Sequence, residues 1–161
     1  MIVSLAEAVE VRERARAEGR LVAVANGAFD LLHVGHLRYL RGAKDLVRPF
    51  GLLLVGVNAD QSVRASKGEG RPLVPEAERA ELVAALACVD LVVLFHEKTA
   101  AALLEALKPD FHAKGTDYTA EGVPERALVE RLGGQTVITG DPKDHSTTDV
   151  LARLQRARGP R

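Results

Sequence analysis

Residues 26–37 read Asn26-Gly27-Ala28-Phe29-Asp30-Leu31-Leu32-His33-Val34-Gly35-His36-Leu37. The apolar run 21–25 before this stretch is typical of a buried strand, and the apolar spacing of 37–47 after it favours a helix. A His-x-Gly-His pattern therefore lies at a strand-to-helix junction, where free N–H groups and the helix dipole attract anions. The two histidines project from one face, and Gly35 leaves no side chain between them and a ligand. The pattern predicts a polyphosphate-binding site.

The histidine pair has two other interpretations. His-x-x-His can be half of a metal site, but zinc takes three or four nitrogen or sulfur ligands. The remaining candidates lack the spacing of a zinc finger: Cys88, His96, His112 and His145. The other alternative is a pair of surface histidines with structural hydrogen bonds. The strand, the glycine-containing turn and the paired histidines together favour phosphate over both.

The composition limits the classes of protein to which this chain can belong. A length of 161 residues predicts one domain spanning 1–161, and the 47% hydrophobic content argues against disorder. No apolar run approaches the roughly 20 residues of a membrane span, and the first 19 residues do not resemble a signal peptide, so we expect a cytoplasmic location without a membrane partner. Cys88 is the one cysteine, and its apolar neighbours predict a buried thiol. A net charge of zero and 4% aromatic residues argue against nucleic-acid binding.

Strands and helices alternate along the chain. Apolar runs predict strands at 21–25, 52–57, 90–95, 110–114 and 135–139. Helices are predicted at 4–19, 37–47, 75–87, 99–108, 125–132 and 146–157, with capping boxes at Ser4 and Ser146, a cap at Thr99, and Pro75 in a first turn. Residues 58–72 are predicted to be a mobile polar loop. This alternation of strands and helices predicts a Rossmann-like, doubly wound α/β fold with a mainly parallel five-stranded sheet and helices on both faces.

Ligands of such folds bind beyond the carboxyl ends of the strands. The loops that follow the strands at 21–25, 52–57, 110–114 and 135–139 open on that edge. The prediction is that five residues distant in sequence converge there: His33, His36, Lys67, Asp117 and Ser146. The chain has no P-loop pattern, no dinucleotide-binding glycine pattern after the first strand and no hydrolase nucleophile elbow.

The stretch Gly27 to His36 resembles the signature of the cytidylyltransferase-like nucleotidyltransferases. Further segments follow in the expected order: Val55–Asp60, Lys67-Gly68, Arg71–Pro75, Glu78-Arg79, Val89-Asp90, Lys108–Asp110, Lys114–Tyr118 and Ser146–Thr148. The resemblance implies a nucleotidylyl transferase fold, a homodimer, and an enzyme that joins a nucleoside triphosphate to a phosphate ester.

Two segments, Arg71–Pro75 and Lys114–Tyr118, are most similar to the adenylyltransferase domain of ADP-heptose synthase. That similarity implies transfer of AMP from ATP to a sugar phosphate such as D-glycero-D-manno-heptose 1-phosphate. Glycerol-3-phosphate cytidylyltransferase, which uses CTP, is the alternative. It has arginines where this chain has Ala87 and Asp141.

The resemblance also implies residue roles. His33, His36 and Lys67 are the expected catalytic groups, acting on the reacting phosphates without a covalent protein intermediate. Nucleotide contacts are expected from Gly27, Ala28, Phe29, Gly35, Lys114, Asp117, Ser146, Thr147 and Thr148, with Tyr118 beside them. Phe29 is expected to be packed, not stacked on the base. The triphosphate implies Mg²⁺, held mainly by substrate and water.

Several roles stay open at this point. Asp30, Arg71 and Arg79 are candidates for substrate-phosphate contacts. Asp30 could instead orient a histidine, bind Mg²⁺ or cap the turn, and Arg79 could form a salt bridge with Glu76 or Glu78. Ser146 could cap its helix while binding phosphate, and His145 could face solvent. A non-catalytic nucleotide-sensing module is the rival functional class, and a purely structural domain is a third.

Overall fold

The computed structural model describes residues 1–142 and 147–157, and within them the strands form one parallel sheet. The strand order is β1-β4-β3-β2-β5-β6, with bounds Ile2–Val3, Leu91–Phe95, Leu52–Asn58, Val22–Gly27, Phe111–Gly115 and Gln135–Thr139. The parallel, doubly wound α/β prediction is confirmed, but the sheet has six strands among the described residues, not five. The unpredicted β1 pairs with β4 through two residues, which is too short to produce a periodic sequence signal.

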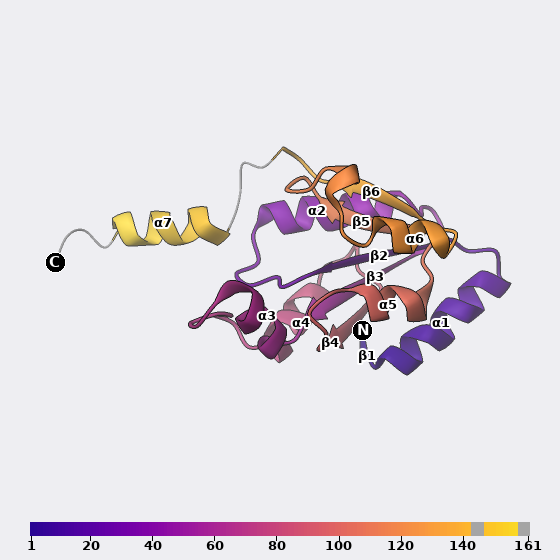
Figure 1. Cartoon of the computed structure of the whole chain (residues 1–161), viewed down its shortest axis with the longest axis horizontal. Coiled ribbons are helices and arrows are strands. Elements are labelled where there is room, and N and C mark those ends of the chain that lie inside the picture. Colours follow the sequence, from indigo (N-terminus) through magenta and orange to yellow (C-terminus); the bar gives the residue numbers. More distant parts are fainter. Residues whose placement is uncertain (143–146, 158–161) are drawn as a thin grey trace.

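Helices cover both faces of the sheet (Figure 1). Helices α2 (Val34–Asp45) and α4 (Glu76–Ala84) cover one face, packing on side chains such as Ala23 and Val55. Helices α1 (Leu5–Ala17), α5 (Ala101–Leu107) and α6 (Arg126–Arg131) cover the other, packing on Val22, Val24 and Leu54. Side chains of a strand alternate between the faces, so each strand contributes to both apolar clusters. Cys88 is buried in the first cluster, as predicted.

The predicted loop over 58–72 is partly wrong. Helix α3 (Asp60–Lys67) begins directly after β3, and only the part after Gly68 lacks regular structure. The helix is short and polar, and Val63 is its one buried apolar side chain, so its sequence lacks the recurring apolar residues from which a helix is predicted. The predicted cap at Thr99 is also wrong, because α5 begins after Ala100 without a side-chain cap. Pro75 is the N-cap of α4, one position before its predicted place.

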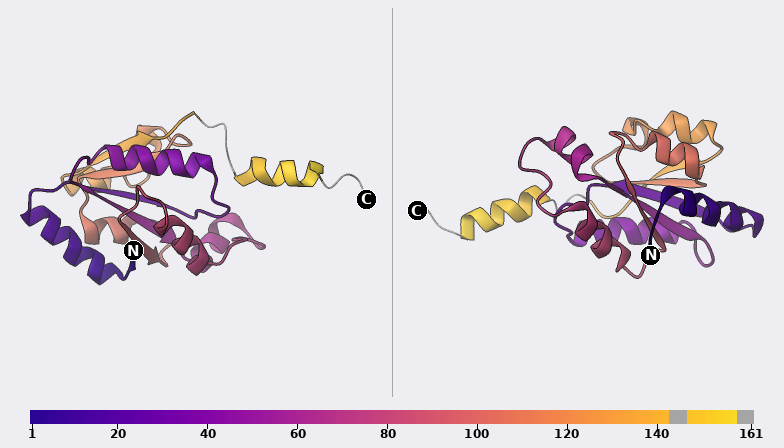
Figure 2. Two further views of the ribbon diagram at one scale, coloured as in Figure 1. Left: turned by 180° about the vertical axis from the view of Figure 1, so that it is seen from behind. Right: turned by 90° about the horizontal axis from the view of Figure 1, so that it is seen from below.

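The first capping box is confirmed. Ser4 Oγ accepts a hydrogen bond from the Glu7 N–H at 3.2 Å, and Glu7 Oε2 accepts one from the Ser4 N–H at 2.7 Å. The second, at Ser146, lies outside the described residues. Helix α7 (Thr147–Ala157) follows it and extends away from the body of the molecule in the views of Figures 1 and 2. No helix among the described residues is both long and apolar enough to cross a membrane.

Candidate functional site

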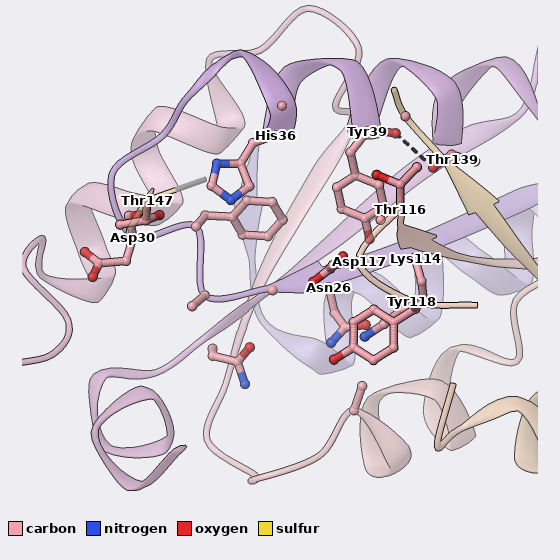
Figure 3. Close-up of a pocket in the computed structure, with 18 of the residues that line it drawn as sticks. Asn26, Asp30, His36, Tyr39, Lys114, Thr116, Asp117, Tyr118, Thr139 and Thr147 are labelled. Carbon is pink, nitrogen blue, oxygen red and sulfur yellow. Dashed lines mark hydrogen bonds between the residues drawn. The ribbon is translucent and has the colours of Figure 1, made fainter. Parts of the chain in front are cut away.

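A cavity of about 580 Å³ opens at the carboxyl ends of the strands. Loops and helix starts after β2, β3, β4, β5 and β6 line it, together with the start of α7. The predicted residues that line it are Gly27, Ala28, Phe29, Asp30, His33, Gly35, His36, Lys67, Lys114, Asp117, Tyr118, Thr147 and Thr148. Figure 3 shows His36 and Thr147 approaching it from one side and Lys114 and Tyr118 from another.

The two histidines begin helix α2. His33 is the N-cap and His36 is the third helical residue, and their ring centroids lie 3.9 Å apart. The His33 backbone N–H donates to His36 Nδ1 at 3.3 Å. Because Nδ1 accepts this bond, a neutral His36 ring has its proton on Nε2. His36 therefore offers an N–H donor beside the free backbone N–H groups of the first helical turn.

Lys67 lies at the end of α3 and lines the same cavity. Burial, together with the charges of His33 and Lys67, lowers the pKa of His36 to about 4. A positive charge near His36 disfavours its protonation, so the ring is neutral at pH 7 in the ligand-free protein. The ammonium group of Lys67, the His36 N–H and the N–H groups at the start of α2 together attract an anion. This combination of an N–H donor, an ammonium group and a helix N-terminus suits the phosphates of a nucleotide.

The Gly27–Asp30 segment forms a constrained turn beneath the histidines. Phe29 has φ 51°, a left-handed conformation that is unusual for a side-chain-bearing residue. Its ring is buried in the core 5.3 Å from the His36 ring, so it is packed as predicted. A Cβ on Gly27 would lie 3.3 Å from the Phe29 ring. Gly27 therefore lets the backbone pass close to the aromatic ring and leaves the turn open to the cavity.

Arg79 stabilises the Gly27–Asp30 turn from the side away from the cavity lining. Its side chain is 0% exposed, donates to the Ala28 and Val74 carbonyl oxygens, and pairs with Asp60 at 2.7 Å. All of these partners belong to the protein, and Arg79 does not line the cavity. The structure thus does not bring Arg79 to a position for substrate phosphate, and its ion-pair partner is Asp60, not Glu76 or Glu78.

Asp30 has a similar structural environment. It is 1% exposed, and its carboxylate accepts hydrogen bonds from Arg71 and from the Leu73 and Val74 N–H groups at 2.7, 2.9 and 3.1 Å. Burial acts to raise the pKa of Asp30, but these hydrogen bonds outweigh it and leave the pKa below its ordinary value. Both oxygens are occupied, so Asp30 anchors the 71–74 segment. Arg71 does not line the cavity.

Lys114 and Tyr118 form a second polar group in the cavity. Lys114 is 7% exposed, and its Nζ lies 4.6 Å from the centroid of the Tyr118 ring. Burial lowers the pKa of Lys114, while the charges of Glu125 and Asp117 act in the opposite direction. The ammonium group thus lies over an aromatic ring and feels the charge of two carboxylates, and it can bind an anionic or hydroxyl-rich ligand.

The start of α7 meets the site at the Asp30 backbone. Thr147 Oγ1 donates to the Asp30 carbonyl oxygen at 2.8 Å, and both Thr147 and Thr148 line the cavity. The predicted contacts of Ser146 and the alternatives for His145 lie outside the described residues. Thr147 therefore links the segment after β6, the last one predicted for the site, to the Gly27–His36 segment, the first one predicted.

Some cavity residues were not predicted as site residues. Lys98 and Thr99 follow β4, and the rule that ligands bind beyond strand ends would have found them had it been applied to that strand. Asn26 lies within the quoted stretch, at the carboxyl end of β2. Glu125 precedes the short helix α6 and reaches the cavity only through the packing of that helix, so no local pattern marks it.

Two histidines with lowered pKa values predict a pH-dependent stability. Burial, with the charge of Lys114, lowers the pKa of His112 to about 3, and His36 titrates near 4, both below the 6.5 of an unperturbed histidine. Between pH 6.5 and 4 the unfolded chain binds more protons than the folded one, so stability falls as the pH falls. We expect His112→Leu to reduce this loss, measured by denaturant unfolding across that pH range. An unchanged pH slope would contradict the prediction.

Comparisons with known proteins agree with this geometry. The model of the cytidylyltransferase-like family matches residues 24–153. Bifunctional protein HldE of Geobacter metallireducens is 47% identical over 148 residues, which are 91% of this chain and 29% of that protein. Bifunctional protein HldE of Pelobacter propionicus is 48% identical over 142 residues, 88% of this chain and 28% of that protein. The chain thus spans less than a third of the length of these relatives.

A solved structure has the same arrangement of elements. The lipopolysaccharide core biosynthesis protein from Thermoplasma volcanium superposes with a TM-score of 0.66 at 28% identity, covering 78% of this chain and all of that one. The family match includes the β2 turn, the histidine pair and the strand ends that form the cavity. On these grounds the chain belongs to the cytidylyltransferase-like family, and it is a nucleotidyltransferase.

Proposed function

We propose that the protein transfers AMP from ATP to the phosphate of a sugar phosphate such as D-glycero-D-manno-heptose 1-phosphate and releases pyrophosphate. The observation that supports this most directly is the cavity shared by the histidine pair at the start of α2 and by Lys67. These groups bind phosphate and stabilise charge, but among the described residues none is arranged as a nucleophile with an activating base. That arrangement suits direct transfer between two phosphates.

The reaction is an in-line displacement. An oxygen of the acceptor phosphate forms a bond to the α-phosphorus of ATP, and the bond from that phosphorus to the bridging oxygen breaks. The electron pair leaves with pyrophosphate. His36 donates from Nε2 as charge develops on the leaving group, with His33 beside it. Lys67 and the hydroxyl groups of Thr147 and Thr148 provide further donors to the phosphates.

Mg²⁺ would neutralise part of the triphosphate charge when bound. Among the described residues no group of three or more histidine, cysteine, aspartate or glutamate side chains could hold an ion. Asp30, the carboxylate nearest the histidine turn, already accepts from Arg71 and two backbone N–H groups. The donor set of the protein thus suits a metal that arrives with the nucleotide and is held mainly by phosphate and water.

The choice of AMP and a sugar phosphate rests on similarity. Arg71–Pro75 and Lys114–Tyr118 resemble the adenylyltransferase domain of ADP-heptose synthase, and the most similar relatives cited above are bifunctional HldE proteins. Asp141, where the glycerol-3-phosphate cytidylyltransferases have arginine, forms an ion pair with Arg38 at 2.5 Å. That pairing gives this side of the cavity a different charge pattern from one with two arginines.

The test is a panel of nucleotides and acceptors. ATP and CTP are each combined with heptose 1-phosphate and glycerol 3-phosphate, and pyrophosphate release is measured. We expect turnover with ATP and heptose 1-phosphate. CTP with glycerol 3-phosphate as the sole productive pair would replace the proposed substrates, and nucleotide binding without pyrophosphate release from any pair would favour a sensing module.

A further inference from the structure

Lys67 is the last residue of helix α3, and it lines the cavity. The side chains from Arg64 to Lys67 are exposed, and the buried residues of the helix are Ser62 and Val63 in its first half. Among the described residues no hydrogen bond or ion pair holds the Lys67 ammonium group. The backbone of α3 therefore decides which part of the cavity that group reaches.

Helix α3 is fixed at its start by contacts with α4. It has no side-chain cap of its own, because its N-cap residue is Ala59. The carboxylate of Glu76, in the first turn of α4, takes that place and accepts a hydrogen bond from the Asp60 N–H at 2.6 Å. The Asp60 carboxylate accepts a hydrogen bond from Arg79 Nη2 at 2.7 Å. Figure 1 shows α3 and α4 next to each other, and these two contacts hold the first residue of α3 against α4.

Arg79 joins this contact to the turn beneath the histidines. Its fully buried guanidinium group also donates to the Ala28 carbonyl oxygen, in the Gly27–Asp30 turn. A guanidinium group is planar and rigid, so the acceptors that it binds are held at a fixed spacing. One side chain thus sets the helix that ends in Lys67 against the turn that precedes the histidine pair.

The length of α3 enlarges any change at its start. The helix has eight residues, so Asp60 and Lys67 are separated by roughly 10 Å along its axis. A tilt of about 10° at the start of such a helix moves its end by about 2 Å. A displacement of about 1 Å at a reacting group can lower a rate on the order of a hundredfold. The contacts of Asp60 therefore bear directly on the place of Lys67.

We infer that Asp60 is a positioning residue for Lys67: with Glu76 and Arg79 it sets the place of the Lys67 ammonium group relative to the histidine turn. Asp60 does not line the cavity, so it acts through the helix and not on the substrate. This inference rests on the proposed function, because it concerns how Lys67 is held for the phosphates of that reaction.

The test is a double-mutant cycle on turnover. Asp60→Asn keeps the shape of the side chain but removes the charge that pairs with Arg79, and we expect kcat for pyrophosphate release to fall about tenfold, because Lys67 loses its fixed place. In a Lys67→Ala background the same change should alter kcat by less than about twofold, since the group that Asp60 positions is absent. Glu76→Gln, which weakens the other contact, should show the same dependence on Lys67 and serves as the second variant if Asp60→Asn does not fold.

Asp110→Asn is the matched control. Arg12 and Asp110 form an ion pair with side chains 2% and 33% exposed, close to the 0% and 31% of Arg79 and Asp60. Neither residue of the control pair lines the cavity, so Asp110→Asn should leave kcat within about twofold of wild type. A similar fall in kcat in both variants would show that loss of a buried ion pair, and not the place of Lys67, determines turnover, and would overturn the inference.

The pKa of His36 reports the place of Lys67 without turnover. Burial is the first cause that lowers this pKa to about 4, followed by the charges of His33 and Lys67. We expect Asp60→Asn to raise the His36 pKa, measured by NMR titration, because the ammonium group is no longer held beside the ring. Loss of the Asp60 charge alone would lower that pKa, so the direction of the shift separates the two effects.

The two measurements distinguish the possible failures. An active enzyme in which Asp60→Asn lowers kcat equally with and without Lys67 would overturn this inference alone. Absence of pyrophosphate release from every substrate pair would contradict the proposed function, and the His36 pKa then decides on the inference. A rise in that pKa that disappears in the Lys67→Ala background supports it, and an unchanged or lowered pKa overturns it.

Discussion

Replacing His36 with alanine is expected to lower turnover by about a hundredfold to a thousandfold, the usual cost of removing one preorganised donor. The direction of the His36 Nε2–H is fixed by the bond that Nδ1 accepts from the His33 backbone, so the alanine variant loses a preorganised donor. The fold should survive, because the ring is only half-buried and its partner N–H lies at the exposed start of a helix. The measurement is kcat for pyrophosphate release, with circular dichroism to verify folding.

His96→Ala is the matched control for this prediction. His96 is an exposed histidine that follows β4 and does not line the cavity, so its removal should leave kcat within about twofold of wild type. Near-normal turnover in the folded His36→Ala variant would refute the assigned mechanism. A comparable loss in the His96 variant would show that the assay responds to general perturbation.

Asp30→Ala is expected to have the largest effect on stability. The change leaves Arg71 and the Leu73 and Val74 N–H groups without their shared acceptor, beneath the turn that supports the histidines. Removing one partner of a buried ion pair typically costs about 3 kcal/mol or more of unfolding free energy. For a chain of this size, 3 kcal/mol corresponds to a decrease in Tm of roughly 6–12 °C. Differential scanning calorimetry measures it directly.

Asp45→Ala tests whether burial is the cause. Asp45 also pairs with an arginine, Arg48, but the two side chains are 62% and 67% exposed. An exposed pair contributes about 0–1 kcal/mol, so Tm should change by at most a few degrees. Equal decreases in Tm for the two variants would contradict the structural role of Asp30.

The local sequence predicted most of the fold and the phosphate end of the site. Apolar runs identified every strand except β1, because only two residues of β1 pair with β4. His33 and His36 were found because a strand, a turn and a helix follow one another without a break, so their spacing alone places them at a helix start. The polar sequence of α3 hid that helix, since it has only one fully buried apolar residue, Val63.

The roles of buried charged residues required the tertiary structure. The sequence left the roles of Asp30 and Arg79 open. Arg79 could bind phosphate or form a salt bridge, and Asp30 could contact phosphate, orient a histidine, bind Mg²⁺ or cap the turn. Packing decides between them: Arg79 reaches Ala28 across 51 residues of sequence, and Asp30 reaches Val74 across 44. Such pairings depend on which loops meet, and no local periodicity encodes them.

The sequence by itself determined a parallel α/β fold with a phosphate-binding turn at His33 and His36, because strand and helix periods and the free N–H groups of a helix start are local properties. Only the tertiary structure decided which side chains face the same space. His112 and Glu125 are isolated in the sequence, yet the pairing of β2 with β5 and the packing before α6 bring their polar atoms to Asn26 and to the cavity. The physical reason is that alternation assigns a residue to a face, whereas neighbouring strands and helices determine what it meets there.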